Sequence, residues 1–243
     1  MSVNSTVVND DAPEGPFQTL TERVYLTLRR EILAGETPPG TRLVRRALGA
    51  RLGVSPLPIM EALHRLERDG LVESEPMYGH RVRLMTAEAV ANDHVLREAL
   101  ECQAARLCAE RAGADDLKRL ARLAAELDAL HESAPASAEH AEKHLEFHLA
   151  IARATGYGGL AAALEKLWFR RLMLLNTHTA AVRGLPRHWH QQLVEALTSR
   201  DADRAESAMR RHVRFNVDQQ IEQLRQRPPG APSTPRARKG RRA

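Results

Sequence analysis

The stretch Ser55-Pro56-Leu57-Pro58-Ile59-Met60-Glu61-Ala62-Leu63 decides the fold of the N-terminal part of this chain. Ser55 is a favourable residue just before a helix, because its side-chain oxygen can accept a hydrogen bond from a free amide of the first turn. A second short helical segment, residues 45–52, precedes this stretch and ends at Gly53, and a candidate β-ribbon follows over residues 71–84. Two short helices joined by a Gly-containing turn and followed by a β-ribbon predict a winged helix-turn-helix, which lays its second helix in the major groove of DNA.

Length and composition favour a helical protein with two domains. The chain has 243 residues, 43% of them hydrophobic but only 4% aromatic, which suffices for packed cores and favours helices. No run of 18 apolar residues occurs, and the N-terminus lacks the basic and apolar regions of a signal peptide. We therefore expect a cytoplasmic protein without a membrane partner. Cys102 and Cys108 lie on different faces of one predicted helix and are expected to be buried thiols in a reducing compartment.

The chain divides into four regions. Residues 1–16 are polar and predict a disordered leader, and residues 17–85 contain the winged helix-turn-helix. Residues 86–227 show successive helical patterns without a strand signal, which predicts an all-α bundle. Residues 228–243 are Pro-rich and then basic, and they predict a disordered tail that accounts for the net charge of +5. The predicted fold class is therefore mainly α, with a winged helix-turn-helix followed by a helical bundle.

The predicted elements alternate with Gly, Pro and Ser breaks. In the first domain we expect helices over 19–34, 45–52 and 56–69 and strands over 71–75 and 81–84. In the second we expect helices over 87–112, 114–132, 137–154, 158–182, 187–199 and 201–226.

One face of the second short helix is expected to contact DNA. Ile59, Leu63 and Leu66 repeat at helical spacing and should point into the core, which leaves the opposite side free. Arginines on the first short helix are suited to phosphate oxygens, and Gly79 marks the tip of the wing. The predicted DNA-binding residues are Arg45, Arg46, Ser55, Leu57, Met60, His64, Arg65, Arg68, Tyr78, Gly79 and His80. The alternatives are a solvated helix face for the single arginines and a protein-binding winged helix for the whole unit.

The segment from Val24 to Val82 resembles the winged helix of GntR-type bacterial transcription regulators. The resemblance rests on Ile32-Leu33-Ala34-Gly35, Pro39-Gly40, Arg42-Leu43, Leu48, Gly53-Val54-Ser55, Pro58, Glu61-Ala62-Leu63, Leu66, Gly70-Leu71-Val72 and Gly79. In that family the positions of Arg46, Pro56 and Met60 include DNA-contacting arginines, of which only Arg46 is kept here. Because Met60 cannot make a bidentate bond to guanine, the resemblance implies either an unusual operator or affinity carried by the remaining arginines and the wing.

Four of the 11 histidines could converge on one point. His144 and His148 lie four residues apart on one predicted helix, so both can face the same side. His190 and His212 lie at similar distances on either side of a predicted turn, and an antiparallel helix pair would place them side by side. Four imidazoles suit a divalent transition metal such as Zn²⁺ or Ni²⁺. The alternative from spacing alone is a polar helix face that His140 extends.

Residues 87–226 resemble the FCD effector domain of the FadR subgroup of GntR regulators. The matching runs are Leu96-Arg97-Glu98-Ala99-Leu100-Glu101, Phe147-His148, His190, Leu193, Ala196-Leu197, Arg200-Asp201 and Ala208-Met209-Arg210-Arg211-His212. In metal-binding members three histidine ligands stand at the positions of His148, His190 and His212, and a carboxylate or amide ligand stands four residues before the first. His144 holds that position here.

The resemblance also implies a small-molecule site. In the family the metal lies at the base of a cavity in the bundle, and a small organic acid often completes its coordination. Arg97, on the first bundle helix, is by resemblance a second partner for that carboxylate. The alternative for Arg97 is a surface salt bridge with Glu101, four residues further on.

Taken together, these features predict a one-component bacterial transcription regulator, and they favour a repressor. We expect a homodimer on a double-stranded DNA operator, because two half-sites need two readers. A small organic acid effector would change operator affinity by linkage. One alternative is a metal-dependent enzyme, for which no G-x-S-x-G, P-loop or H-E-x-x-H motif is present. The other is a regulator with a purely structural metal and no small-molecule effector.

Overall fold

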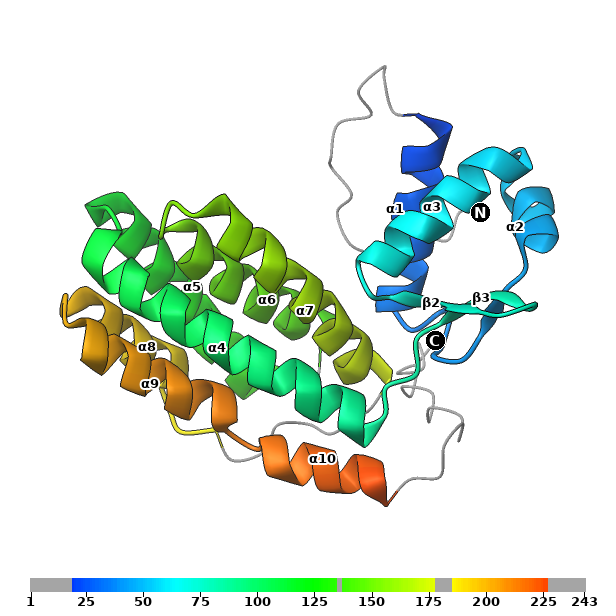
Figure 1. The fold of residues 1–243 in the computed structure, drawn as a ribbon. Helices are drawn as coiled ribbons and strands as arrows, with labels where there is room; N and C mark the ends of the chain where they lie inside the picture. The colour runs from blue at the N-terminus through cyan, green and yellow to red at the C-terminus, as the bar shows by residue number, and fades with distance from the viewer. Residues whose placement is uncertain (1–18, 135–136, 178–184, 227–243) are drawn as a thin grey trace, which may run out of the picture.

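The computed structural model describes residues 19–134, 137–177 and 185–226, and these fold into two adjoining parts (Figure 1). A small part with three helices and a three-stranded sheet lies beside a larger all-helical part. The predicted fold class, mainly α with a winged helix-turn-helix followed by a helical bundle, is confirmed. The elements of the small part are α1 (Leu20–Leu33), β1 (Arg42–Leu43), α2 (Arg45–Leu52), α3 (Pro56–Arg68), β2 (Val72–Glu75) and β3 (Gly79–Val82).

Helix α3 packs against α1 through the apolar face that its sequence predicts. Ile59, Leu63 and Leu66 are completely buried, as are Leu28 and Ile32 of α1 to within 1%. Burying one such side chain contributes about 1.5–3 kcal/mol. The apolar spacing of α3 therefore fixes which of its faces remains available to solvent.

The turn between α2 and α3 follows the prediction in one respect and departs from it in another. Gly53 ends α2 in the left-handed conformation, with φ 67°, which glycine adopts without strain. Ser55 is the N-cap residue of α3, but its side chain makes no capping hydrogen bond. The expectation that the Ser55 hydroxyl satisfies an amide of this helix is therefore wrong.

The sheet has the order β1-β3-β2 and is antiparallel throughout. Val72 pairs with Val82 and Ser74 pairs with His80 across the wing. The second wing strand thus begins two residues earlier than predicted from the sequence. The short strand β1 was not predicted, because two residues carry no period that a pattern can reveal.

The larger part is built around the 25-residue helix α4, which packs along α9. Its helices are α4 (Ala87–Arg111), α5 (Ala114–Ser133), α6 (Ala138–Arg153), α7 (Gly158–Thr177), α8 (Trp189–Thr198), α9 (Ala202–Arg214) and α10 (Val217–Arg225). The single helix expected over 201–226 is instead two helices, because Asn216 adopts a left-handed φ of 59° between α9 and α10. The expected extension of α7 to residue 182 lies outside the described residues.

The core of the winged helix continues onto the helical part. Phe169, Met173 and Leu174 of α7 belong to the same buried cluster as the side chains of α1 and α3. Gly70 has a φ of 74°, and a Cβ at this position would lie 2.8 Å from Nη1 of Arg170. These contacts place the winged helix directly on α7.

Three further expectations concern the chain ends, the two cysteines and membrane-spanning helices. The leader and the basic tail lie outside the described residues. Cys102 and Cys108 are buried free thiols, as expected. Among the described residues, no helix is long and apolar enough to cross a membrane.

Candidate metal centre and nucleic-acid interface

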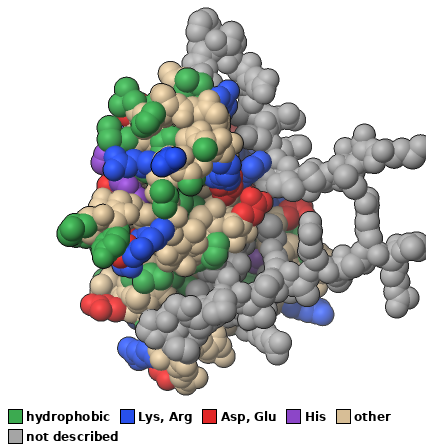
Figure 2. Space-filling model, turned by 90° about the vertical axis from the view of Figure 1, so that its right-hand side faces the viewer, with side chains coloured by type: hydrophobic (Ala, Val, Ile, Leu, Met, Phe, Trp, Pro, Cys, Tyr) green, Lys and Arg blue, Asp and Glu red, His purple; other side chains and the backbone are tan. Residues whose placement is uncertain are grey.

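The outward face of α2 and α3 carries most of the residues predicted to contact DNA. Arg45 and Arg46 are exposed on α2, and His64 and Arg68 are exposed on α3. Leu57 is 58% exposed at the start of α3, although it is a large apolar residue. Figure 2 looks at this end of the molecule and shows Lys and Arg side chains interspersed with hydrophobic ones. Such a surface can combine phosphate contacts with apolar contacts to base edges.

Arg65 occupies a different setting from the one predicted. Its guanidinium pairs with Glu22 of α1 and lies 3.7 Å from the ring centre of Tyr25. The side chain is therefore engaged in joining α1 to α3 rather than directed away from the domain. Arg51 is held in a similar way, by a bidentate pair with Glu31 at 2.7 and 2.9 Å.

The wing presents one of its two predicted side chains to solvent. Tyr78 is 64% exposed beside the turn at Gly79, whose φ is 91°, and the Arg42 guanidinium lies 4.6 Å from the Tyr78 ring centre. His80, in contrast, is only 8% exposed and lies on the inner side of β3. The expectation that His80 enters a DNA groove does not match this position.

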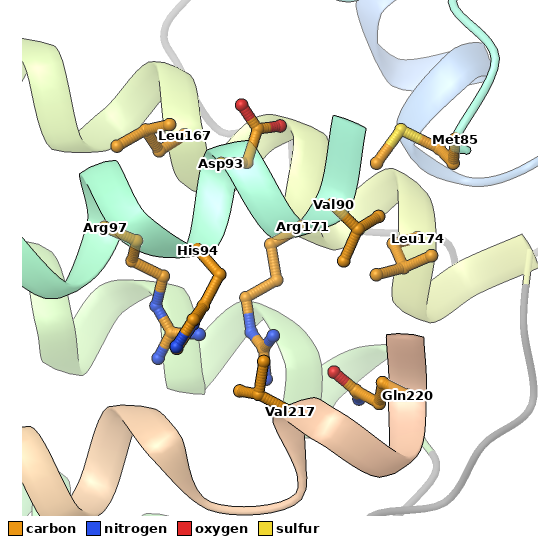
Figure 3. Close-up of a pocket in the computed structure, with 10 residues that line it drawn as sticks. All are labelled: Met85, Val90, Asp93, His94, Arg97, Leu167, Arg171, Leu174, Val217 and Gln220. Atoms are coloured by element: carbon orange, nitrogen blue, oxygen red, sulfur yellow. The ribbon is translucent and has the colours of Figure 1, made fainter. Parts of the chain in front are cut away.

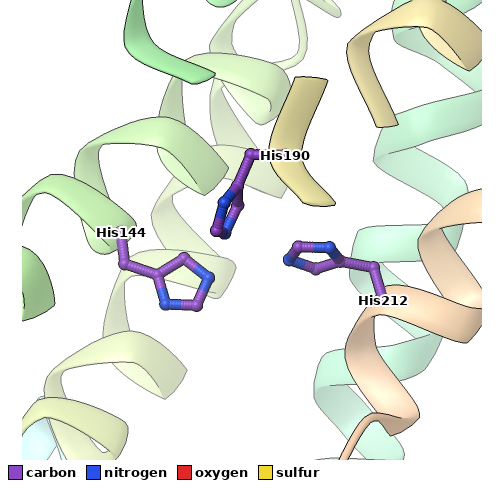
Figure 4. A group of neighbouring side chains, drawn as sticks. All are labelled: His144, His190 and His212. Atoms are coloured by element: carbon purple, nitrogen blue, oxygen red, sulfur yellow. The ribbon is translucent and has the colours of Figure 1, made fainter. Parts of the chain in front are cut away.

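Three of the four predicted metal ligands converge inside the bundle (Figure 4). His144 of α6, His190 of α8 and His212 of α9 each offer a ring nitrogen, and these atoms all lie within 4.8 Å of one another. His148 lies alongside, with its Nε2 3.0 Å from Nε2 of His144. The antiparallel arrangement of α8 and α9 inferred from the sequence is what brings His190 and His212 together.

The spacing of these rings suits shared coordination of one ion. Two imidazoles on one tetrahedral metal at ~2.0–2.1 Å have ring centres about 5 Å apart. The observed separations are 5.1 Å for His144 and His190, 5.0 Å for His190 and His212, and 5.9 Å for His144 and His212. His148 lies 4.8 Å from His144 and 5.1 Å from His212 by the same measure. His144, His190 and His212 are therefore positioned to serve as ligands of a single metal, and His148 lies beside two of them.

Within the group His144, His190 and His212, two buried ring nitrogens have no hydrogen-bond partner among the described residues. These are Nε2 of His190, a completely buried residue, and Nδ1 of His212, a residue that is 6% exposed. An unsatisfied buried polar atom costs about 1–3 kcal/mol, and a metal ion would remove that cost. The donor set and its orphaned atoms therefore fit a divalent transition metal.

Carboxylates support the histidines from behind, which sequence reasoning missed. Asp128 of α5 accepts a hydrogen bond from Nδ1 of His190 at 2.6 Å and from the backbone amides of His190 and Gln191 at 3.1 Å. Glu101 of α4 contacts Nδ1 of His148. Metal-binding histidines commonly have such a partner, which fixes the ring and its tautomer. Asp128 could have been noticed as an acidic residue on the apolar stripe of its helix.

Burial disfavours the charged form of three of the four imidazoles. It lowers the pKa of His144, His148 and His212, and the other histidines add to this effect at His144 and His212. Burial alone would raise the pKa of Glu101, but His148 and Arg97 outweigh it and lower that pKa to about 2. Because only a neutral imidazole can bind a metal, the lowered pKa values of His144, His148 and His212 favour the form that a ligand needs.

A pocket lies on the side of the bundle next to the winged helix (Figure 3). Its polar lining includes Arg97 and His94 of α4 and Arg171 of α7, which point in the same direction between α4 and α10. Met85, in the segment that leads from β3 to α4, forms part of the apolar lining. The pocket is open to solvent, and the space between its lining side chains is about 390 Å³ including that opening.

Arg97 is buried and Arg171 is half-buried, and the two arginines differ in their partners. Arg97 donates from Nε to Glu101 at 2.6 Å, so the predicted pair with Glu101 forms, but it is buried rather than on the surface. Nε of Arg171 has no hydrogen-bond partner among the described residues, and burial lowers the pKa of this guanidinium to about 9. A guanidinium with a buried and unpaired N–H group favours an anionic ligand. Sequence reasoning missed Arg171, although it shares a helical stripe with Leu164 and Trp168.

A winged helix with an outward basic face, joined to a helical bundle with a central histidine cluster, is typical of a DNA-binding transcription regulator. Comparison with known families places the chain within this class. Residues 20–82 match the gntR family of bacterial regulatory proteins, and residues 94–215 match the FCD domain. The chain therefore belongs to the gntR family of regulatory proteins and has an FCD domain. Since the members are transcription regulators, the chain is not an enzyme.

Individual proteins of known sequence or structure are similar to this chain along most of its length. An uncharacterized HTH-type transcriptional regulator of Streptomyces ambofaciens is 30% identical over 85% of this chain and 86% of its own length. The HTH-type transcriptional repressor RspR of Escherichia coli K12 is 27% identical over 87% and 92%, respectively. Among solved structures, E. coli McbR/YncC has a TM-score of 0.67 and 25% identity, and it covers 86% of this chain and 99% of that one. A GntR regulator of Rhodococcus, at 22% identity and a TM-score of 0.68 over 83% and 97%, has the same fold.

Proposed function

We propose that this regulator is a repressor that holds a divalent transition metal and binds a small organic acid in its helical domain. The observation that carries the proposal is the convergence of His144, His190 and His212 in the core of the bundle. The names of two relatives, the repressors RspR and GlaR of E. coli, support repression as the direction of control. As a DNA-binding regulator the protein would act in the cytoplasm.

The DNA partner is a double-stranded operator read by the winged helix. Exposed side chains on α2, α3 and the wing support Arg45, Arg46, Ser55, Leu57, His64, Arg68 and Tyr78 as contacting residues, and Met60 and Gly79 are partly exposed beside them. A homodimer follows from the need to read two half-sites. The proposal takes residues 17–85 as the DNA-binding domain and residues 86–227 as the effector domain.

The metal ligands of the proposal are His144, His190 and His212, with His148 as the fourth. Zn²⁺ and Ni²⁺ are the ions that an imidazole set of this kind favours. When bound, the ion supplies a fixed positive charge that attracts a carboxylate. Asp128 and Glu101 hold the imidazoles in position, and they need no metal to do so.

The effector is a small organic acid whose carboxylate is attracted by Arg97 and Arg171. The cationic lining of the pocket and the absence of a hydrogen-bond partner for Nε of Arg171 support this class of ligand. Met85 and Val90 line the same pocket and also belong to the buried cluster of the winged helix. An acid in this pocket would therefore contact the joint between the two domains and change operator affinity by linkage.

A second candidate is a purely structural metal without a small-molecule effector. Four histidines would fill all four positions of a tetrahedral ion, which is typical of closed structural sites. The complete burial of His190 agrees with this alternative. The two candidates differ in whether an acid changes DNA binding.

The test measures binding to an operator selected from randomised duplexes, by fluorescence anisotropy, with a panel of small organic acids. We expect at least one acid to weaken binding of the metal-loaded protein and to lose its effect after chelation. Arg171→Met should reduce this response, whereas Arg153→Met, at an exposed position of α6, should not. If no acid alters the affinity of the metal-loaded protein, the structural-metal alternative replaces the effector proposal.

A further inference from the structure

A second group of candidate ligands lies in the winged helix, away from the helical bundle. His64 and Glu67 stand three residues apart on α3, and His80 lies opposite them on β3. One ligand atom from each lies within 4.8 Å of the other two. Oε2 of Glu67 is 3.5 Å from Nδ1 of His64 and 3.9 Å from Nε2 of His80.

The unpaired ring nitrogens of His80 indicate that a ligand is missing from this group of side chains. The side chain is buried, yet neither Nδ1 nor Nε2 has a hydrogen-bond partner among the described residues. A neutral imidazole carries one donor and one acceptor, so both functions are unsatisfied. Burial also lowers the pKa of His80, with Arg45 and His64 acting in the same direction and Glu67 opposing them. A bound cation that takes one ring nitrogen as a ligand would satisfy the acceptor.

Glu67 is held in the orientation that a ligand needs. Its Oε1 accepts hydrogen bonds from the backbone amide of Ser74 on β2, at 3.2 Å, and from the Ser74 hydroxyl. Its Oε2 is left on the side of the two histidines. A ligating carboxylate is commonly fixed in this way by hydrogen bonds to its other oxygen.

We propose that His64, Glu67 and His80 form a binding site for a divalent transition metal that fastens the wing to the DNA-reading helix. Two imidazoles and one carboxylate are a ligand set that Zn²⁺ and related ions accept, with one position open to water. The ring centres of His64 and His80 are 5.5 Å apart, close to the ~5 Å of two imidazoles that share a tetrahedral ion.

The position of the site connects it to DNA recognition. His64 is exposed on the face of α3 that we assign to the operator, and His80 pairs with Ser74 across the wing. A metal here would engage His64 and join α3 to β3. It would also raise the stability of the folded state, because the three ligands are brought together only by folding.

The test uses the full-length protein and cobalt(II) as the probe ion, followed by equilibrium dialysis and absorption spectroscopy. We expect His64→Ala to lower the cobalt content by about one ion per chain, since three ligands then become two. His188→Ala removes another exposed histidine and should leave the content unchanged. Because His64 is exposed, its substitution leaves the core packing intact.

Two further measurements make the outcome decisive. Glu67→Gln should weaken cobalt binding at the same site, whereas Glu61→Gln, one turn and a half away on α3, should not. Added zinc should raise the melting temperature of the wild type more than that of His64→Ala. Equal cobalt contents in wild type and His64→Ala, or an equal zinc effect on both, would overturn the proposal.

The same experiment separates this site from the metal centre of the helical bundle. In the His190→Ala/His212→Ala variant the His64-dependent cobalt should persist. If the wild type holds one ion that disappears with His64→Ala, the wing site stands and the centre in the bundle fails. If one ion remains with His64→Ala and disappears with His190→Ala/His212→Ala, the wing site fails and the centre in the bundle stands.

Discussion

The two parts of the molecule use charged side chains in opposite ways. In the winged helix Arg45 and Arg46 are exposed, whereas in the bundle Arg97 is only 5% exposed and Nε of Arg171 is buried. An exposed arginine costs little and remains available for phosphates, but a buried one is costly unless a counter-charge lies beside it. The outward charges are therefore available to DNA, whereas under the proposed function the inward charges form a network that a metal and a small organic acid complete.

The strongest test of this contrast is removal of the buried counter-charge. Glu101 is 1% exposed, and it accepts hydrogen bonds from Arg97 at 2.6 Å and from Nε1 of Trp168 at 3.2 Å. Glu101→Ala leaves Arg97 without a charged partner and should lower the free energy of unfolding by about 3–5 kcal/mol. Denaturant titration of metal-free protein checks this.

A surface pair provides the matched control for that substitution. Glu73 pairs with Arg81 at 2.7 Å, with both side chains about one-third exposed to solvent. Glu73→Ala should cost at most about 1 kcal/mol. Equal losses for Glu101→Ala and Glu73→Ala would mean that burial does not distinguish the two regions.

A smaller effect is expected on the exposed side, and on DNA rather than on stability. Arg46→Ala should weaken operator binding by about 1–3 kcal/mol, because the side chain is free to contact DNA. The melting temperature should not change. Anisotropy titrations on the selected operator measure the first quantity and thermal melts the second. Wild-type affinity in this variant would remove α2 from the interface.

Base specificity can be sharpened at Met60, which lies on α3 one helical turn from His64. Met60→Arg should shift preference toward operators with an added G·C pair in each half-site, since a bidentate arginine–guanine contact discriminates by about 1–3 kcal/mol. Selection from randomised duplexes compares the two proteins. Identical motifs would place this position away from the bases.

The smallest predicted effect concerns the arginine that the structure turns inward. Arg65→Ala removes the contacts with Glu22 and with the buried Tyr25 ring. Because the Arg65 and Glu22 side chains are partly exposed, the free energy of unfolding should fall by about 1 kcal/mol. Its effect on operator affinity should be smaller than that of Arg46→Ala. A larger loss of affinity than of stability would return Arg65 to the DNA-contacting face.

Much of the fold could be predicted because its signals are local. Gly53 and the apolar spacing of Ile59, Leu63 and Leu66 define the helix-turn-helix without reference to the rest of the chain. The convergence of the histidines was also accessible, since an i, i+4 pair and two matched helix positions determine it. The break at Asn216 was not predicted, because asparagine in a helical pattern does not by itself reveal a left-handed residue.

The supporting residues of the centre needed the tertiary structure. Asp128 meets His190 across 62 positions of sequence, and Glu101 meets Trp168 across 67. No local pattern encodes such a distance. Arg171 likewise reads as an ordinary helical arginine until α4 and α10 are packed around it. His80 was placed at the exposed wing tip because alternation alone does not reveal that β3 turns it inward.

The most direct test of the central claim is the metal content of the helical domain, measured by elemental analysis. The His64→Ala protein is suited to this, because it lacks a ligand of the wing site. After loading with zinc or nickel and extensive dialysis, we predict about one ion per chain, held by the histidine cluster. The ion should be absent from the same protein that also carries His190→Ala and His212→Ala. Less than about 0.1 ion per chain before those two substitutions would contradict the account, and the four histidines would then be a polar cavity.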